Sequence, residues 1–266
     1  MRSPKRLIPT PAEGEILTRA ESQGIIERTI GMSAAESISV NVGSNVTNNI
    51  RFAANNVSTA GSVADINIAV TSSFGPKKAT VVTNNTSDEA LLATVRQSEA
   101  LAKLAPDDPE AMPNLGPQNI RTVNAAFTQT EAIDATALAD AAMTALEPAR
   151  RAGDLAAAGY LVVTTGTNAL GNKEKLFAYH KSTNANYTLT VRTTDGTGSG
   201  WAGAEHPDWR QLDIAGVSSR AIEKARLSRN PVAIEPGRYT VILEPQAVGD
   251  PETRLLERLY PYLQRS

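Results

Sequence analysis

The chain has 266 residues, of which 41% are hydrophobic and 20% are charged, and its formal net charge is −2. This composition excludes a fully disordered chain and predicts a core shared between two modest domains. The small negative charge and the 5% aromatic content leave neither a basic surface nor a stacking platform for nucleic acid. The absence of cysteine excludes disulfides and thiolate metal sites, and it fits a reducing compartment.

Targeting signals are not evident in the sequence. The basic residues near Met1 are followed by no apolar stretch, and no run approaches the roughly 20 apolar residues that a membrane span needs. We therefore expect a cytoplasmic protein with no membrane partner.

The first 105 residues predict an N-terminal α+β domain. Apolar residues recur at helical spacing between 10 and 29, and Thr86 with Glu89 has the spacing of a capping box for a second helix that ends before Pro106. Between these helices, alternating apolar and polar residues predict four strands, at 36–43, 49–57, 63–73 and 78–84. Their connections are too short for parallel crossovers, so we expect antiparallel pairing.

Residues 106–135 contain four closely spaced prolines and predict a linker. Residues 136–266 then predict a second α+β domain that ends in a short helical tail. Its expected helices are 136–153 and 217–229, and its expected strands are 158–166, 175–183, 186–194, 198–204 and 238–244. The expected fold class is therefore α+β, with two similar-sized domains that each have a mostly antiparallel sheet and packed helices.

Five segments carry a family resemblance, and they occur in the order that the family uses. They are IRFAANNVSTAG (50–61), FGPKKATVVTNNTSDEAL (74–91), QSEALAKLAPDDPEAMPNLGPQ (97–118), VRTTDGTGSGW (191–201) and IEPGRYTVILEP (234–245). Together they resemble the TldD/TldE (PmbA) metallopeptidase-related family over its first and second segments. Only sixteen residues follow Asp250, so we expect the family's long C-terminal domain to be missing.

The resemblance implies a cytoplasmic proteolysis system that degrades unfolded peptides with a pair of related subunits, one carrying zinc and one silent. The zinc subunit of that family uses an HExxxH motif with a further cysteine ligand. Here Pro245 replaces the first histidine, Gln246 the glutamate and Asp250 the second histidine. Proline offers no side-chain ligand and glutamine cannot act as a general base. We therefore expect no catalytic residue, no metal site and no cofactor, and we interpret Asp250 as a helix N-cap.

Asparagines cluster between 41 and 56, and they favour tight turns because asparagine tolerates positive φ. The alternative is that strand edges near Arg51, Asn55 and Asn56 meet an extended peptide. Arg192 could hold a carboxylate or only a structural partner. We interpret DGTGSG, residues 195–200, as a hairpin turn and not a phosphate loop, because strands flank it on both sides.

His180 and His206 are the chain's two histidines, and neither has a second imidazole at ligand spacing, so we expect structural roles for both. Two functional hypotheses stay open. The chain is either a non-catalytic, TldE-type component with a zinc-bearing TldD-like partner and unfolded peptides as ligands, or a truncated, catalytically dead remnant. Such a remnant would act at most as a peptide- or protein-binding module.

Overall fold

The computed structural model describes residues 16–240, 242, 244 and 248. The chain divides into two compact units between Asn230 and Pro231. In the second unit, the described residues of 238–244 are not in a strand, so the strand expected there is wrong for those residues. A strand forms only beside a neighbour, and no described residue pairs with them. The tail helix expected from Asp250 lies outside the described residues.

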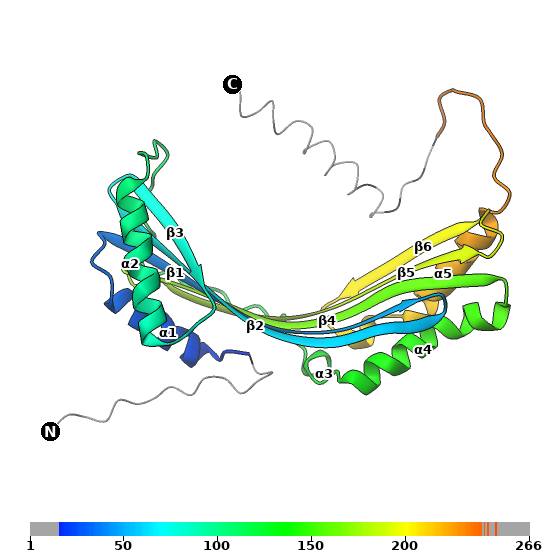
Figure 1. The fold of residues 1–266 in the computed structure, drawn as a ribbon, viewed down its shortest axis with the longest axis horizontal. Coiled ribbons are helices and arrows are strands. Elements are labelled where there is room, and N and C mark those ends of the chain that lie inside the picture. The colour runs from blue at the N-terminus through cyan, green and yellow to red at the C-terminus, as the bar shows by residue number, and fades with distance from the viewer. Residues whose placement is uncertain (1–15, 241, 243, 245–247, 249–266) are drawn as a thin grey trace. The chain divides into compact units, whose positions relative to one another are not determined.

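The first unit contains one six-stranded antiparallel sheet in the order β3-β2-β1-β4-β5-β6 within its described residues (Figure 1). The strands are β1 (Ser37–Ala53), β2 (Asn56–Phe74), β3 (Lys77–Thr83), β4 (Leu155–Asn172), β5 (Phe177–Thr193) and β6 (Ser199–His206). The helices are α1 (Arg19–Gly31), α2 (Asp88–Leu104), α3 (Thr128–Glu131), α4 (Ala135–Ala152) and α5 (Ile214–Leu227), with a short 3-10 turn at Trp209–Gln211.

The antiparallel α+β class is confirmed, but the expectation of a separate sheet in each half is wrong. β1 from the first half pairs with β4 from the second, from Ser39 opposite Asn172 to Phe52 opposite Gly159. β1, β4 and β5 have 17, 18 and 17 residues. At about 3.3 Å per residue each strand is long enough to run beneath both groups of helices. Domain boundaries at 105 and 136 stay a prediction.

Two pairs of expected strands are single strands. The stretches 36–43 and 49–57 largely merge into β1, and 175–183 and 186–194 largely merge into β5. Asn48 and Asn184, expected at turns, lie inside these strands and pair with neighbours in the ladder. Asn48 is paired on both sides, with β2 and β4, and Asn184 is paired with β4. This pairing outweighs the weak intrinsic preference of asparagine for turns.

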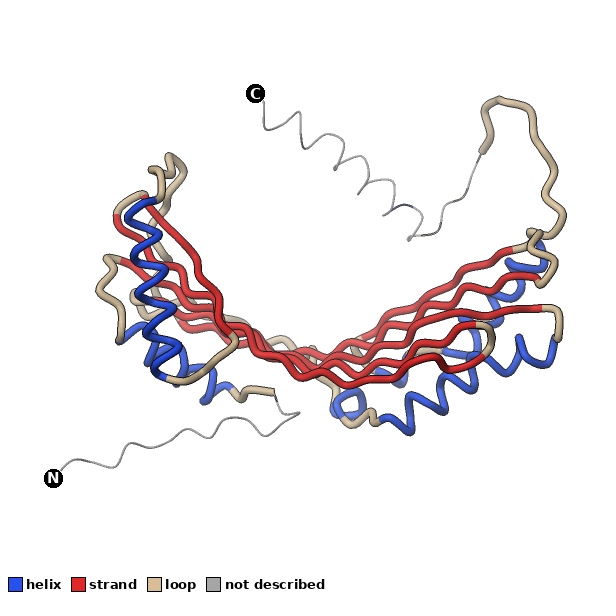
Figure 2. The backbone as a smooth tube through the Cα atoms, viewed as in Figure 1, coloured by secondary structure: helices blue, strands red, loops and turns tan. Residues whose placement is uncertain are grey.

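All the helices of the first unit pack on one face of the sheet, and the sheet bends around its opposite face (Figure 2). Two clusters of buried residues hold the layers together. One joins α1 and α2 to residues of β1 such as Val40. The other joins α4 and α5 to Ile50, Phe52 and Tyr187. Strand alternation explains this layout, because every second side chain of β1 points at the helices.

The caps of α1 and α2 fix the ends of the helices that flank the first three strands. Thr18 and Glu21 form a capping box on α1. The capping box expected at Thr86 is wrong by one residue, because Ser87 caps α2 through its hydroxyl, which accepts from the Ala90 N–H at 3.3 Å. Within α2, buried Glu99 accepts hydrogen bonds from Ser33 Oγ and the Ala34 N–H, at 2.8 and 2.7 Å. Glu99 thereby fastens the connection between α1 and β1 onto α2.

Residues 106–127 form no helix and no strand, and α3 follows them at Thr128–Glu131. The linker at 106–135 stays a prediction. The segment reaches the sheet at Ala125, which forms a parallel bridge with Ser182 of β5. None of the helices in the described part of the chain is long and apolar enough to cross a membrane.

Candidate functional site

One face of the sheet carries none of the helices in the described part of the chain, and it is rich in polar side chains. We call it the bare face. It is defined by these alternate residues of four adjacent strands: Asn41, Asn45, Thr47, Asn49 and Arg51 of β1; Tyr160, Val162, Thr164 and Asn168 of β4; His180, Asn184, Asn186, Thr188, Thr190 and Arg192 of β5; and Trp201 and Glu205 of β6. Their neighbours in the sequence point at the helices and are mostly buried. The bare face thus offers amide and hydroxyl groups over a broad surface.

A row of planar groups crosses the bare face. The guanidinium carbon of Arg51 lies 4.7 Å from the centre of the Tyr160 ring, which is cation–π geometry. Tyr160 lies opposite Thr188 in the register, and Thr188 lies opposite Gly203 of β6. A Cβ on Gly203 would come within 2.9 Å of the Trp201 ring, so this ring lies over the glycine. Arg51, Tyr160 and Trp201 therefore form one strip, which we call the aromatic row.

Two of the four residues expected at a peptide contact, Arg51 and Arg192, lie on the bare face. The other two lie at the β1–β2 hairpin, where Asn55 has a φ of 63°. The side chain of Asn55 donates to Leu155 O at 2.8 Å and accepts from the Ala157 N–H at 2.7 Å. The side chain of Asn56 donates to Ala54 O at 2.9 Å. The structure therefore gives Asn55 and Asn56 hydrogen bonds within the hairpin and β4. The expected peptide contact stays a prediction.

The degenerate motif positions Pro245, Gln246 and Asp250 lie outside the described residues. Within the described part of the chain, no three His, Cys, Asp or Glu side chains lie close enough to hold a metal ion. His180 is exposed on the bare face. His206 accepts at Nδ1 from the Asp208 N–H at 2.9 Å, which is a local structural bond.

A cavity of about 850 Å³ lies between residues 118–126 and strands β4 and β5. Its lining shares Asn41, Asn168 and His180 with the bare face, and it includes Arg19, Arg121 and Lys181 but no carboxylate. Lys181 is paired with Glu131 at 2.7 Å. The cavity lining thus contains basic residues and no acidic residue.

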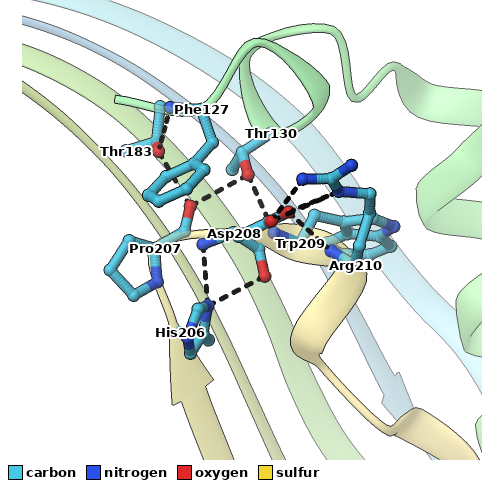
Figure 3. A network of polar contacts seen from close by, with 8 residues as sticks. All are labelled: Phe127, Thr130, Thr183, His206, Pro207, Asp208, Trp209 and Arg210. Carbon is cyan, nitrogen blue, oxygen red and sulfur yellow. Dashed lines mark hydrogen bonds and ion pairs between the residues drawn. The ribbon is translucent and has the colours of Figure 1, made fainter. Parts of the chain in front are cut away.

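A polar network holds the end of β6 against α3 (Figure 3). Pro207 O accepts from Thr130 Oγ1 at 2.9 Å and from Thr183 Oγ1 at 2.8 Å. The nearly buried Asp208 carboxylate accepts from the Arg210 guanidinium at 2.7 Å. The hydrogen bond from Arg210 lowers the pKa of Asp208 below its usual value. This network fastens the segment before α4 to the sheet, and sequence analysis missed it because its members are far apart in the chain.

The DGTGSG segment is a hairpin turn between β5 and β6, as expected. Asp195 Oδ1 accepts from Thr193 Oγ1 at 2.5 Å, and from Thr197 N and Thr197 Oγ1, each at 3.0 Å. Gly200 has a separate role at the start of β6. A Cβ there would lie 2.2 Å from Ala221 O, so the glycine lets α5 approach the strand.

Acid is expected to weaken this turn. The hydrogen bonds from Thr193 and Thr197 lower the pKa of Asp195 from 3.8 to about 2. A carboxyl group whose pKa is lower in the folded chain than in the unfolded chain stabilises the fold at pH values above its unfolded pKa. That stabilisation is lost as the pH falls through the folded pKa. These pKa values set a window between pH 4 and pH 2. Within it, we expect the free energy of unfolding to fall more in the native chain than in Asp195→Asn. Urea unfolding at a series of pH values measures this, and equal slopes for both chains would contradict it.

Tyr160 and Trp201 are the candidate residues that sequence analysis missed. Both sit in segments with strand alternation, and each could have been placed opposite the buried positions of its strand. The alternation could not show that they share a row with Arg51, because that depends on which strands are neighbours.

The first unit is thus an α+β protein with one long antiparallel sheet, helices on one face and a polar surface on the other. Residues 39–102 match the family model described as PmbA/TldA metallopeptidase domain 1. The resemblance inferred from the sequence is confirmed over this segment, which is similar to the first domain of the PmbA/TldD family. No curated protein matches the chain.

Solved structures share the fold at low sequence identity. TldE from Thermococcus kodakarensis superimposes with a TM-score of 0.69 at 14% identity, covering 77% of this chain and 47% of that one. A putative modulator of a DNA gyrase from Thermotoga maritima gives a TM-score of 0.71 at 13% identity, covering 81% of this chain and 50% of that one. A putative modulator of DNA gyrase from Bacteroides thetaiotaomicron gives a TM-score of 0.75 at 10% identity, covering 90% of this chain and 56% of that one. The chain therefore spans about half the length of these proteins.

Proposed function

We propose that the chain is a non-catalytic, TldE-type component of a cytoplasmic metallopeptidase system, and that its bare face holds unfolded peptide for a zinc-bearing TldD-like subunit. The observation that carries the proposal is the aromatic row on a polar, helix-free sheet face. Unfolded peptides present backbone amides and mixed side chains. Asparagine and threonine can bond to the amides as donor or acceptor, and planar groups stack on many side chains.

The residues at the motif position support a silent role. Pro245 and Gln246 cannot replace an imidazole ligand and a general base, and a single carboxylate at Asp250 is too few ligands for zinc. In the proposed complex the metal and the activated water belong to the partner. Binding of peptide here would raise its local concentration beside the partner's active site.

Co-expression with an HExxxH-bearing family member from the same organism tests the pairing. We expect co-purification in a fixed ratio, and faster hydrolysis of an unfolded peptide than by the zinc subunit alone. A chain that neither associates nor changes the rate is the unpaired remnant, and the proposed pairing is then wrong.

Peptide binding by the aromatic row is tested on the chain alone. In a Trp209→Phe background, Trp201 is the one remaining tryptophan, and its fluorescence reports on an unstructured peptide added in increasing amounts. We expect Arg51→Ala combined with Tyr160→Ala to weaken binding about tenfold, since cation–π and stacking contacts contribute about 0.5 to 2 kcal/mol. Arg220→Ala, on the exposed surface of α5, removes an arginine away from the bare face and serves as control. Equal effects of the two sets of changes, or no change in Trp201 fluorescence, would contradict peptide binding at the row.

A further inference from the structure

Among the residues that the structure describes, no strand neighbours the outer edge of β2 over most of its length. β3 pairs with β2 only from Ile68 to Phe74. No described residue pairs with the outer side of Asn56–Asn67, and all of these residues except Ile66 are exposed. An unpaired strand leaves a row of backbone N–H and C=O groups ready to bond to another strand. We call Asn56–Asn67 the open edge.

Apart from a bulge at Ser58, near one end, the open edge lacks the features that usually prevent strands from pairing. It contains no proline, lysine or arginine, and its one charge is Asp65. Most of its side chains are small, and Val63 is 59% exposed. Edge strands of soluble proteins commonly carry inward charges, prolines or bulges that block association. Here the backbone is accessible along a nearly neutral stretch.

The regular part of the open edge has Val63 at its centre. A bulge at Ser58 interrupts the β1–β2 register, because Arg51 faces Thr59 but Phe52 faces Val57. At the other end β3 begins opposite Ile68. The regular and unpaired stretch is therefore Thr59–Asn67, and its midpoint is Val63.

We propose that the open edge pairs antiparallel with the same edge of a second copy of this chain, about a twofold axis at Val63. A twofold interface needs a surface that is complementary to itself. In this register Val63 faces Val63 of the other copy, Gly61 faces Asp65, Ala60 faces Ile66 and Thr59 faces Asn67. Small side chains thus lie opposite larger ones, and the two Asp65 carboxylates are not opposed. A register centred on Asp65 would bring those like charges together and is disfavoured.

The two six-stranded sheets join into one continuous sheet in this dimer. The side chains at the edge are small, so the buried area is at the low end for protein interfaces, and we expect a weak, concentration-dependent dimer. The inference rests on the edge alone and not on the proposed peptide binding.

Cross-linking tests the register, because the chain has no cysteine of its own. Directly opposed residues of antiparallel strands have Cα atoms about 4.5 to 5.5 Å apart, which suits a disulfide. We expect Val63→Cys to form a disulfide-linked dimer on mild oxidation. Asp65→Cys is the matched control on the same face, and it should remain monomeric because the proposed register places the two cysteines far apart. More cross-linking at position 65 than at 63 would overturn the register.

Sedimentation equilibrium tests the association itself. We expect the native chain to dimerise with rising concentration, and Val63→Lys to weaken the dimer by about tenfold or more, because two lysines would face each other. Val82→Lys, at an equally exposed valine of β3, should leave the dimer unchanged. A native chain that stays monomeric over its whole soluble range, or equal weakening by both lysines, would overturn the proposal. Urea unfolding of each variant confirms that the fold is intact.

Discussion

Replacing Gly200 with alanine is expected to lower the free energy of unfolding by about 3 kcal/mol or more, a large effect for one methyl group. The added Cβ would lie 2.2 Å from Ala221 O and 2.4 Å from Ala225 N. Both atoms belong to the backbone of α5, so they cannot rotate away as a flexible side chain could. The helix must therefore move off the sheet, and its buried residues Val217 and Ile222 lose packing in the larger core cluster.

Gly43→Ala is the matched control for this prediction. Gly43 lies in β1, and a Cβ added there would have Asn67 O as its nearest neighbour, at 3.9 Å, which is an ordinary contact distance. We expect Gly43→Ala to change stability by less than about 1 kcal/mol. Urea unfolding followed by circular dichroism compares the two variants. A Gly200→Ala chain as stable as Gly43→Ala would show that α5 does not need this close approach.

Replacing Tyr187 with alanine is expected to lower the free energy of unfolding by about 3 to 5 kcal/mol. Among the described residues, Tyr187 is the largest fully buried side chain, with 0% of its surface exposed. Its ring lies 6.4 Å from that of Phe52, between centroids, and packs in the cluster formed with α4 and α5. Alanine would leave a cavity that the surrounding long strands cannot close. Urea unfolding measures the loss, and a cost below about 1 kcal/mol would contradict the described core.

Tyr187→Phe separates the contribution of the ring from that of the hydroxyl. Tyr187 Oη and Ser218 Oγ are 2.9 Å apart, and Ser218 Oγ also donates to Ile214 O at 2.8 Å. Phenylalanine keeps the ring and removes one bond, so we expect a loss of about 1 kcal/mol. Burial raises the pKa of Tyr187 to about 12 from its usual 10, although the bond to Ser218 opposes this shift. Because the pKa of Tyr187 is higher in the folded chain than in the unfolded chain, part of the free energy of unfolding is lost as pH rises from 10 to about 12. We expect this loss to disappear in Tyr187→Phe.

Helix-forming segments could be predicted from local sequence because their signals are local. The expected helices at 136–153 and 217–229 correspond closely to α4 and α5, with Asp134 and Asp213 as N-caps. Gly153 ends α4 with a φ of 72°, which glycine adopts without strain. The hairpin at 195–200 was equally predictable from its turn residues. Each of these features depends on residues within a few positions of one another.

The extent of the strands and the candidate site could not be predicted in the same way. Asparagine-rich stretches look like turns when read alone, but Asn45 and Asn49 become strand residues because β2 and β4 pair with β1 on both sides. The aromatic row depends on the same long-range pairing, since Arg51, Tyr160 and Trp201 come from three strands far apart in the sequence. No local pattern specifies that register.

The sequence by itself therefore determined the four long helices, the alternation of each strand, the tight hairpin and the family resemblance. Alternation with a period of two residues indicates which residues of a strand share a face of the sheet. The motifs that carry the family resemblance are contiguous stretches of the sequence. Only the tertiary structure decided that the two halves share one sheet, which face stays bare and which strand edge stays open. Those features are set by pairing between distant segments, whose energy depends on neighbours that a local pattern does not contain.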